Sequence, residues 1–298
     1  MPAPISFRRR IARKLPRAIK TTQHWLRAMA AGGRPATRVV FVVGSQRSGT
    51  RLPLHIMDYS PEISTYSEGA APYFEKVMLQ PLDYVAAQVR RSPSPIVVLK
   101  PICETHRIHE LLDRFPGSKA VWIFRHYQGA SLSASVKWKS GPVGLRRLAT
   151  GDLKAASWRA GGLTEEKLAV VKRLYRDDMS AYEADVVMWY LRNGLFFDMG
   201  ADARPDVLLV RYEDLVGDPR RRFAELFDFI GTPMPERAVE AIKESTGSKR
   251  EYPDIHPEIR ALCDALHVRL VAHYEQRIRR RAQAAASEPA GLRALAGR

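Results

Sequence analysis

The sequence has few cysteines, no long apolar run and no acidic residue near its N-terminus. Its two cysteines, Cys103 and Cys263, have neither a metal-ligand spacing nor a CxxC pattern, which favours free thiols in a reducing compartment. No run of about 18 uncharged apolar residues occurs, and this excludes a transmembrane helix. Arg27 interrupts the first apolar stretch, so we expect no secretory signal peptide and a cytoplasmic protein.

Acidic residues are scarce at the two ends rather than along the whole chain. The formal net charge is +16, but residues 1–40 contain ten Arg or Lys and no Asp or Glu, and residues 277–298 contain six Arg and one Glu. Residues 41–276 are left with a net charge of +1. Since this central part is nearly neutral, its chemistry does not require a polyanionic polymer, and we expect no specific nucleic-acid partner.

The N-terminal end carries apolar residues at every fourth position: Phe7, Ile11, Leu15 and Ile19. With arginines on the other faces, this spacing is typical of a basic amphipathic helix on an anionic membrane. Pro16 interrupts the pattern, because proline removes a helical hydrogen bond and crowds the preceding turn. Peripheral membrane contact and a solvated or partner-binding extension therefore both stay open.

Short apolar runs alternate with longer helical patterns in the central part. Runs that are apolar at every position favour strands buried on both faces of a parallel sheet. They cover residues 39–43, 96–99, 120–124 and 207–210, with a further strand at 63–66. Helical patterns cover residues 106–115, 128–137 and 219–230, and a helical insert fills about 142–198. The alternation predicts an α/β fold of three layers, α/β/α, around a central, mostly parallel sheet.

No internal repeat or low-complexity linker divides this region. We expect one domain at residues 38–276, a basic N-terminal extension at 1–37 and a basic C-terminal tail at 277–298. Within the insert, Ser180 and Glu183 have the spacing of a capping box, which predicts the start of a helix there.

The first strand leads directly into the loop GSQRSGT at residues 44–50. Glycines let successive N–H groups turn toward an anion, and a following helix N-terminus adds its positive end, so the loop predicts a phosphate or sulfate cradle. The G-x4-G spacing is that of a Walker A loop, but the Lys that should follow the second glycine is missing. Arg47 is the basic residue inside the loop, and Arg51 comes directly after it.

A second candidate phosphate contact follows the third predicted strand. Arg125 stands at the end of that strand, and Ser133 lies eight positions later on the next predicted helix. An arginine and a hydroxyl so placed suit a second phosphate group, although an exposed arginine and an ordinary helical serine would give the same spacing.

These features together resemble the sulfotransferases that use 3′-phosphoadenosine 5′-phosphosulfate (PAPS). The resemblance rests on the GSQRSGT loop, on Arg125 with Ser133, and on the VRYEDL segment at residues 210–215 followed by Asp218 and Pro219. It covers residues 38 to about 250 and is closer to bacterial or carbohydrate-type members than to the cytosolic aryl and steroid subgroup. It implies a P-loop-like fold and sulfuryl transfer to a hydroxyl or amine without a metal.

The resemblance also implies roles for single residues. The residues that would hold the 5′-phosphosulfate are Gln46, Arg47, Ser48, Gly49, Thr50 and Arg51. Arg125 and Ser133 would bind the 3′-phosphate, Tyr212 would lie near the adenine, and Lys249 with Arg250 would form a late basic loop. Three positions depart from the family pattern: Arg51 replaces a frequent threonine, Leu52 replaces the adenine-stacking tryptophan of cytosolic members, and Ile102 stands where their catalytic histidine is expected.

The catalytic groups must therefore come from other positions. Arg47 would stabilise charge on the departing phosphate, and Lys100, at the end of a predicted strand, would lie beside the transferred group. Glu68 is the first candidate for the general base, since carbohydrate and tyrosyl sulfotransferases carry a glutamate in a similar place. Glu104 and His106 are the alternatives.

Two other functions stay open from the sequence. A P-loop kinase or NTPase is disfavoured by the missing Walker lysine and by Arg211 and Tyr212, which separate the last strand from Glu213 where Mg²⁺ would need an acid. A basic membrane- or nucleic-acid-binding protein would use only the two ends.

The acceptor of the expected sulfotransferase is a small molecule or a glycan. Five aromatic residues would either line its cleft or belong to the core: Trp138, Trp158, Trp189, Tyr190 and Phe196.

Overall fold

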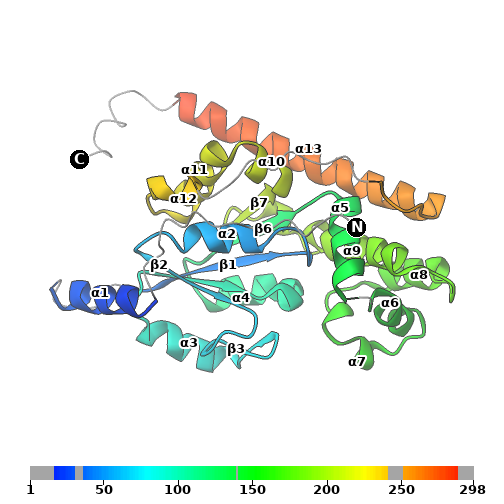
Figure 1. The fold of residues 1–298 in the computed structure, drawn as a ribbon, viewed down its shortest axis with the longest axis horizontal. Coiled ribbons are helices and arrows are strands. Elements are labelled where there is room, and N and C mark those ends of the chain that lie inside the picture. Colours follow the sequence, from blue (N-terminus) through cyan, green and yellow to red (C-terminus); the bar gives the residue numbers. More distant parts are fainter. Residues whose placement is uncertain (1–16, 31–35, 139, 241–250, 288–298) are drawn as a thin grey trace, which may run out of the picture.

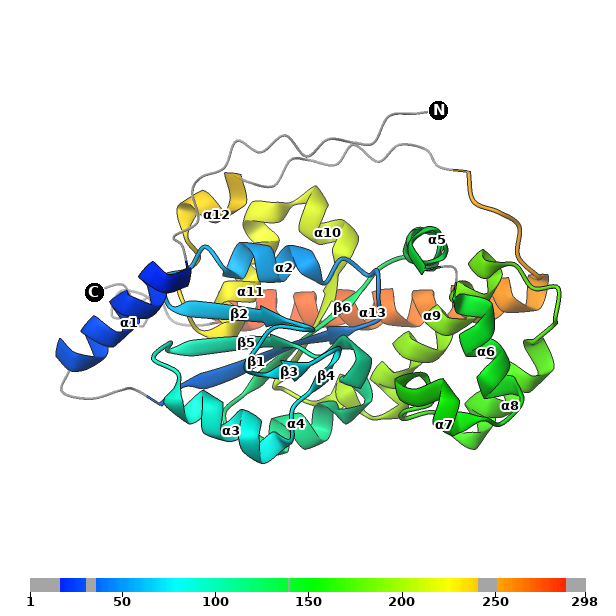
Figure 2. The same cartoon turned by 60° about the horizontal axis from the view of Figure 1, so that its bottom comes forward.

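The computed structural model describes residues 17–30, 36–138, 140–240 and 251–287. Its centre is a five-stranded sheet in the order β2-β5-β1-β6-β7, in which every neighbouring pair is parallel. The strands are β1 (Arg38–Gly44), β2 (Ile63–Ser67), β5 (Ile96–Lys100), β6 (Lys119–Phe124) and β7 (Val207–Arg211). Helices cover both faces (Figures 1 and 2). The three-layer α/β/α fold predicted from the sequence is confirmed.

The apolar runs form strands because both of their faces are buried. Phe41 faces one layer of helices and Val42 the other, and neither side chain is exposed. Alternate residues of the central strands thus enter two separate hydrophobic clusters. A strand without a polar face can be accommodated only inside a doubly covered parallel sheet, which explains why sequence alone located these strands.

The two faces of the sheet carry different helices. One is covered by α2 (Arg51–Met57), α10 (Tyr212–Gly217), α11 (Pro219–Ile230) and α12 (Glu236–Glu240). The other is covered by α3 (Leu82–Arg91) and α4 (Ile108–Arg114), with the hairpin β3 (Phe74–Glu75) and β4 (Met78–Leu79) beside them. Helix α4 is preceded by the 3₁₀ helix η1 (Ile102–Arg107), so the helical segment expected at 106–115 begins earlier than predicted.

The stretch predicted as a helical insert consists of helices. After α5 (Tyr127–Trp138) come α6 (Gly141–Ala149), α7 (Leu153–Ala156), η2 (Ser157–Arg159), α8 (Glu165–Leu174), α9 (Ala181–Asp198) and η3 (Ala201–Ala203). The hydroxyl of Ser180 accepts a hydrogen bond from the N–H of Glu183 at 3.1 Å, which confirms the predicted N-cap of α9. The Glu183 carboxylate binds Arg176 and the N–H of His256, so it ties α9 to the segment before the last helix.

Ordered helices also occupy both basic ends. Helix α1 covers Arg17–Ala30, and α13 (Pro257–Ser287) runs across the boundary that we predicted at residue 276. Helix α13 packs on α9 and β7. Within the described residues, no helix combines the length and the apolar composition needed to span a bilayer.

Candidate active site

The loop of residues 44–50 joins β1 to α2 at the carboxyl end of the sheet. Gly44 has a φ of +130°, and a Cβ atom there would lie 2.2 Å from the carbonyl oxygen of Ile123 on β6. Only glycine allows this close approach of two strands. Arg47 has a φ of +63°, a left-handed conformation that is uncommon for a residue with a side chain and that often occurs at functional sites.

Thr105 on η1 fixes the start of the loop. Its buried hydroxyl accepts a hydrogen bond from the N–H of Gly44 at 3.2 Å and lies 2.9 Å from the carbonyl oxygen of the same residue. Sequence reasoning missed Thr105, because a contact between residues 61 positions apart leaves no local signal.

Several donors of the loop have no partner. Among the described residues, the N–H groups of Gln46, Arg47, Gly49 and Thr50 donate to no other group, and the hydroxyl of the fully buried Ser48 makes no hydrogen bond. A buried donor without a partner, such as the Ser48 hydroxyl, is costly unless a ligand satisfies it. These donors suit the anion cradle that the sequence suggests.

Arg47 connects this loop to α5. Its Nε and Nη2 donate to the hydroxyl oxygen of Ser133 at 2.9 and 2.8 Å, and its guanidinium lies 5.6 Å from the ring centre of Trp138. The structure thus brings together two of the predicted site residues. It pairs Ser133 with Arg47, where the sequence suggested a pair of Ser133 and Arg125.

Arg125 packs instead on Tyr212. Its guanidinium lies 4.7 Å from the ring centre of Tyr212 and passes close to Gly129, where a Cβ atom would be 3.1 Å from Nη2. The ring of Tyr212 also packs on Gly49 of the loop, and a Cβ atom at Gly49 would lie 2.0 Å from the Tyr212 ring. The loop, Tyr212 and Arg125 therefore form one contiguous contact surface built from β1, β6 and β7.

Three arginines give this surface a strong positive charge. No carboxylate pairs with Arg47, Arg51 or Arg125 in the part of the chain that the structure describes. Burial lowers the pKa of Arg47, and the charges of Arg51 and Arg125 lower it further. Uncompensated cations around a glycine-rich loop favour a ligand with more than one anionic group.

Glu68 and Lys100 form an ion pair at the ends of β2 and β5. The two strands are neighbours, and Ser67 lies opposite Lys100, so the Glu68 carboxylate meets the Lys100 ammonium directly. Burial lowers the pKa of Lys100, and the Glu68 carboxylate opposes this effect. The charge of Arg51 also lowers the pKa of Lys100, so the pair of Glu68 and Lys100 lies close enough to the cationic surface to interact with it.

Cys103 lies between this pair and the loop. Its thiol accepts a hydrogen bond from Nε2 of Gln46 at 3.8 Å, and burial raises its pKa to about 11. A thiol with such a pKa stays protonated at neutral pH and is a poor nucleophile. Its place in the site is therefore structural: it supports the side chain of Gln46.

The two alternative base candidates face other partners. Glu104 is buried and accepts hydrogen bonds from the N–H of Leu79, at 2.5 Å, and from Arg107, so its carboxylate binds β4 and the end of η1. His106 packs against two glycines before α8, and burial together with the charge of Arg192 lowers its pKa to about 4. A neutral imidazole with so low a pKa is a weak base. These surroundings favour Glu68 for that role.

Arg192 on α9 is a buried cation that the sequence reading missed. Its side chain is 1% exposed, and Nη1 donates to the carbonyl oxygens of Trp158 and Gly161 at 3.3 Å each. Burial lowers its pKa to about 10. The guanidinium thereby holds the turn after η2 against α9. No periodicity distinguishes such a residue from the apolar positions around it.

The remaining predicted residues fall into four groups. Trp158 and Tyr190 are partly buried, and Tyr190 packs against the core. Lys249 and Arg250 lie outside the described residues. Trp189 and Phe196 are buried in the core, which answers the question that the sequence left open for them. Trp138 is 47% exposed beside Arg47, and its ring is therefore accessible at the site.

The acidic residues of the YEDL segment bind protein groups. Glu213 accepts a hydrogen bond from the N–H of His126 at 3.0 Å and lies 3.6 Å from Arg211. Asp214 accepts one from the hydroxyl of Tyr274 at 2.8 Å and pairs with Arg222 at 3.4 Å. Both carboxylates stabilise the fold around β7 and α10, and neither belongs to a metal-binding group among the described residues.

The contact of Gly49 with Tyr212 gives a direct prediction. In Gly49→Ala, the added methyl group would overlap the Tyr212 ring, so we expect the ring to shift and affinity for an adenine nucleotide to fall about tenfold or more. Gly151→Ala is the matched control, because Gly151 has a similar φ of +79° but open space around it. Both variants should lose about 1 kcal/mol of stability from backbone strain. Nucleotide titration and denaturant unfolding measure the two effects, and equal affinity in both variants would contradict the packing of Tyr212 on the loop.

The comparisons with known proteins agree with the sequence motifs. Residues 157–249 match the family model of the sulfotransferase domain, which confirms the resemblance to sulfotransferases. The matched segment contains α9, β7 and Tyr212, whereas the loop, Arg125 and Ser133 precede it. A search of curated proteins gives no match.

Several solved sulfotransferase structures are similar to this chain. The sulfotransferase domain of the curacin biosynthetic pathway is 15% identical with a TM-score of 0.47, and the similarity covers 79% of this chain and 99% of that one. The enzyme from Alicyclobacillus acidocaldarius is 15% identical with a TM-score of 0.43, covering 82% and 97%. A mouse sulfotransferase complexed with PAP is 12% identical with a TM-score of 0.37, covering 85% and 90%.

Proposed function

We propose that this chain transfers a sulfuryl group from PAPS to a hydroxyl or amine acceptor. The observation that carries the proposal is the surface formed by the loop, Arg47, Arg125 and Tyr212. It combines unpartnered N–H donors, three arginines without carboxylate partners and an aromatic ring. These features match a nucleotide whose ribose carries two anionic groups and an aromatic base.

Each part of the donor has a candidate partner. The loop N–H groups, Ser48 and Arg47 would hold the 5′-phosphosulfate. Arg125 is the cation beside Tyr212, so we assign the 3′-phosphate to Arg125 and the adenine to the neighbourhood of Tyr212. Ser133 completes the set through its hydrogen bonds to Arg47, which keep the arginine at the loop. No residue of the proposed site requires a metal.

The transfer itself needs a cation at the leaving group and a base at the acceptor. The acceptor oxygen forms a bond to sulfur while the bond between sulfur and the 5′-phosphate oxygen breaks, and the electron pair stays on that phosphate. Arg47 stabilises the charge that develops there. Glu68 takes the proton of the acceptor, and Lys100 holds the Glu68 carboxylate in place through their ion pair.

The acceptor side lies next to Trp138. Its exposed ring beside Arg47 offers an apolar face at the site, which suits a sugar or an aromatic acceptor. The choice among a glycan, a glycolipid and a secondary metabolite stays open. Both cysteines are buried free thiols, which fits a reducing compartment, and we place the enzyme in the cytoplasm.

A calorimetric titration tests the proposed donor. The probe is 3′-phosphoadenosine 5′-phosphate (PAP), the product that remains after transfer, in a buffer with EDTA, and ATP serves as the comparison. We expect PAP to bind without a metal and more tightly than ATP. Binding of ATP that requires Mg²⁺, with no binding of PAP, would overturn the proposal in favour of a P-loop kinase or NTPase.

A further inference from the structure

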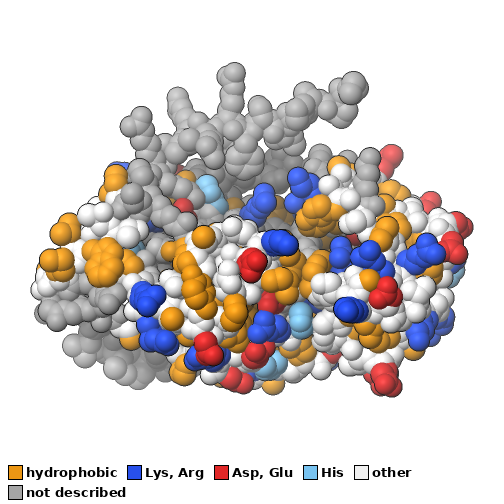
Figure 3. All heavy atoms as spheres, turned by 90° about the horizontal axis from the view of Figure 1, so that it is seen from below, with side chains coloured by type: hydrophobic (Ala, Val, Ile, Leu, Met, Phe, Trp, Pro, Cys, Tyr) orange, Lys and Arg blue, Asp and Glu red, His pale blue; other side chains and the backbone are white. Residues whose placement is uncertain are grey.

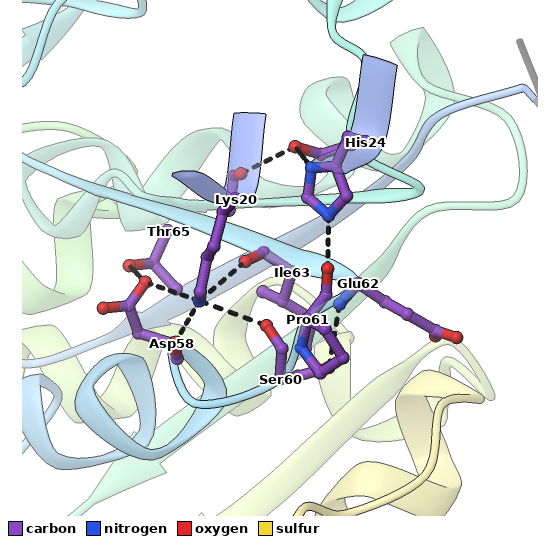
Figure 4. Close-up of polar contacts among 10 residues, drawn as sticks. Lys20, His24, Asp58, Ser60, Pro61, Glu62, Ile63 and Thr65 are labelled. Carbon is purple, nitrogen blue, oxygen red and sulfur yellow. Dashed lines mark hydrogen bonds and ion pairs between the residues drawn. The ribbon is translucent and has the colours of Figure 1, made fainter. Parts of the chain in front are cut away.

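Helix α1 is held to the sheet by two buried polar side chains. The ammonium of Lys20 donates to the carbonyl oxygens of Asp58, Ser60 and Ile63, with distances of 3.1 and 3.5 Å to the last two. Figure 4 shows it enclosed by these groups. His24 binds the carbonyl oxygen of Pro61 through Nε2 and the hydroxyl of Ser94 through Nδ1, the latter at 2.9 Å. These contacts fix which face of the helix points inward.

The opposite face of α1 carries exposed apolar side chains. Ile19, Leu26 and Met29 are 44%, 59% and 74% exposed, although all three are large hydrophobic residues. At 100° per residue, they lie on the side of the helix opposite to Lys20 and His24. In Figures 1 and 3, α1 forms the left-hand end of the molecule, where hydrophobic side chains gather on the surface. An exposed apolar stripe of this kind marks an interaction surface.

The charge next to the stripe identifies its partner. The sequence before α1 contains Arg8, Arg9, Arg10, Arg13 and Lys14, and no Asp or Glu occurs between residues 1 and 40. Basic residues beside an amphipathic helix are attracted to anionic lipid head groups, and its apolar side chains insert between them. Residues 41–276 are nearly neutral, so this attraction belongs to the two basic ends, and the N-terminal one is continuous in sequence with the stripe.

We propose that the exposed face of α1 docks the protein on an anionic membrane surface, through Ile19, Leu26 and Met29. This surface is separate from the proposed active site. Helix α1 contacts the segments that lead into β2 and β5, at the amino ends of the strands, whereas the loop of residues 44–50 lies at the carboxyl end. Docking therefore leaves the cationic surface around Arg47 accessible, and it does not depend on the proposed transfer reaction.

Vesicle co-sedimentation of the full chain tests the proposal. The probes are vesicles of phosphatidylcholine mixed with phosphatidylglycerol and vesicles of phosphatidylcholine alone. We expect binding to the mixed vesicles only, weakened by salt. The triple variant Ile19→Ser, Leu26→Ser, Met29→Ser should bind about tenfold less or worse, because three apolar side chains no longer insert. Lys20 and His24 are kept in this variant, so α1 stays in place.

A second triple variant controls for the loss of exposed apolar surface. Val77→Ser, Val143→Ser and Val268→Ser remove three exposed valines from other parts of the molecule, and this variant should bind the mixed vesicles as well as the wild type does. Thermal melting checks that both variants are folded. Equal binding by the α1 variant, equal binding to neutral vesicles, or a solution dimer that the α1 variant dissociates would each overturn the proposal. The last result would assign the stripe to a second copy of the chain.

Discussion

Arg47→Met is expected to lower kcat by about 10² to 10³, which is the usual effect of removing one group that stabilises charge in the transition state. Arg47 is placed for this role by three features: its left-handed backbone, its two hydrogen bonds to Ser133, and its position inside a loop with free N–H donors. The measurement is turnover of labelled PAPS with the best acceptor from a panel of sugars, phenols and amines.

Two further variants separate charge from position. Arg47→Lys keeps the positive charge but loses the forked hydrogen bonds to Ser133, so we expect an intermediate kcat. Arg90→Ala removes an exposed arginine of α3 and should leave kcat unchanged. If Arg47→Met keeps more than about a third of the wild-type kcat, the assignment of Arg47 to the leaving group is wrong.

Glu68→Gln is expected to lower kcat by about 10² to 10⁴ while PAP binds as tightly as in the wild type. Glutamine has nearly the same shape and still accepts a hydrogen bond from Lys100, but it cannot take a proton from the acceptor. The acid limb of the pH profile of kcat should therefore disappear in this variant. Calorimetry for PAP and steady-state kinetics over a range of pH measure the two quantities.

Glu75→Gln is the matched control for this substitution, because Glu75 is an exposed glutamate on β3. It should change neither kcat nor the pH profile. A loss of kcat in Glu68→Gln with an unchanged pH profile would show that Glu68 only positions Lys100. Full activity in Glu68→Gln would remove Glu68 from the reaction and return the question to Glu104 and His106.

The sheet could be predicted from the sequence because its signal is local. Each of the strands β1, β5, β6 and β7 contains a short run of apolar residues with a charged residue only at one end, and such runs fit a doubly covered parallel sheet. The loop after β1 was visible for the same reason, since its glycines and Arg47 are consecutive. The positions of the strands and of the loop depend on residues that are close in sequence, and they could therefore be predicted.

The pairing of side chains could not be predicted in the same way. The ion pair of Glu68 with Lys100 joins residues 32 positions apart, and the bond of Arg47 to Ser133 joins residues 86 positions apart. Both contacts depend on the order of the strands in the sheet. All four residues were candidates from the sequence, but the strand order determines which of their side chains are in contact.

The N-terminal end shows the same limit. The apolar spacing from Phe7 to Ile19 suggested an amphipathic helix that Pro16 interrupts, and of its four apolar residues only Ile19, on α1, lies among the described residues. The packing of α1 on the sheet could not be predicted, because Lys20 finds its partners 38 to 43 positions later.

The most direct test of the donor site compares two nucleotides on two proteins. PAP and adenosine 5′-phosphate differ only in the 3′-phosphate, and wild type and Arg125→Ala differ only in its assigned partner. We expect the variant to lose about 10- to 100-fold in affinity for PAP, as for a hydrogen bond to a charged group, and much less for adenosine 5′-phosphate. Equal losses for both nucleotides would show that Arg125 acts only through Tyr212, and the assignment of the 3′-phosphate to Arg125 would be wrong.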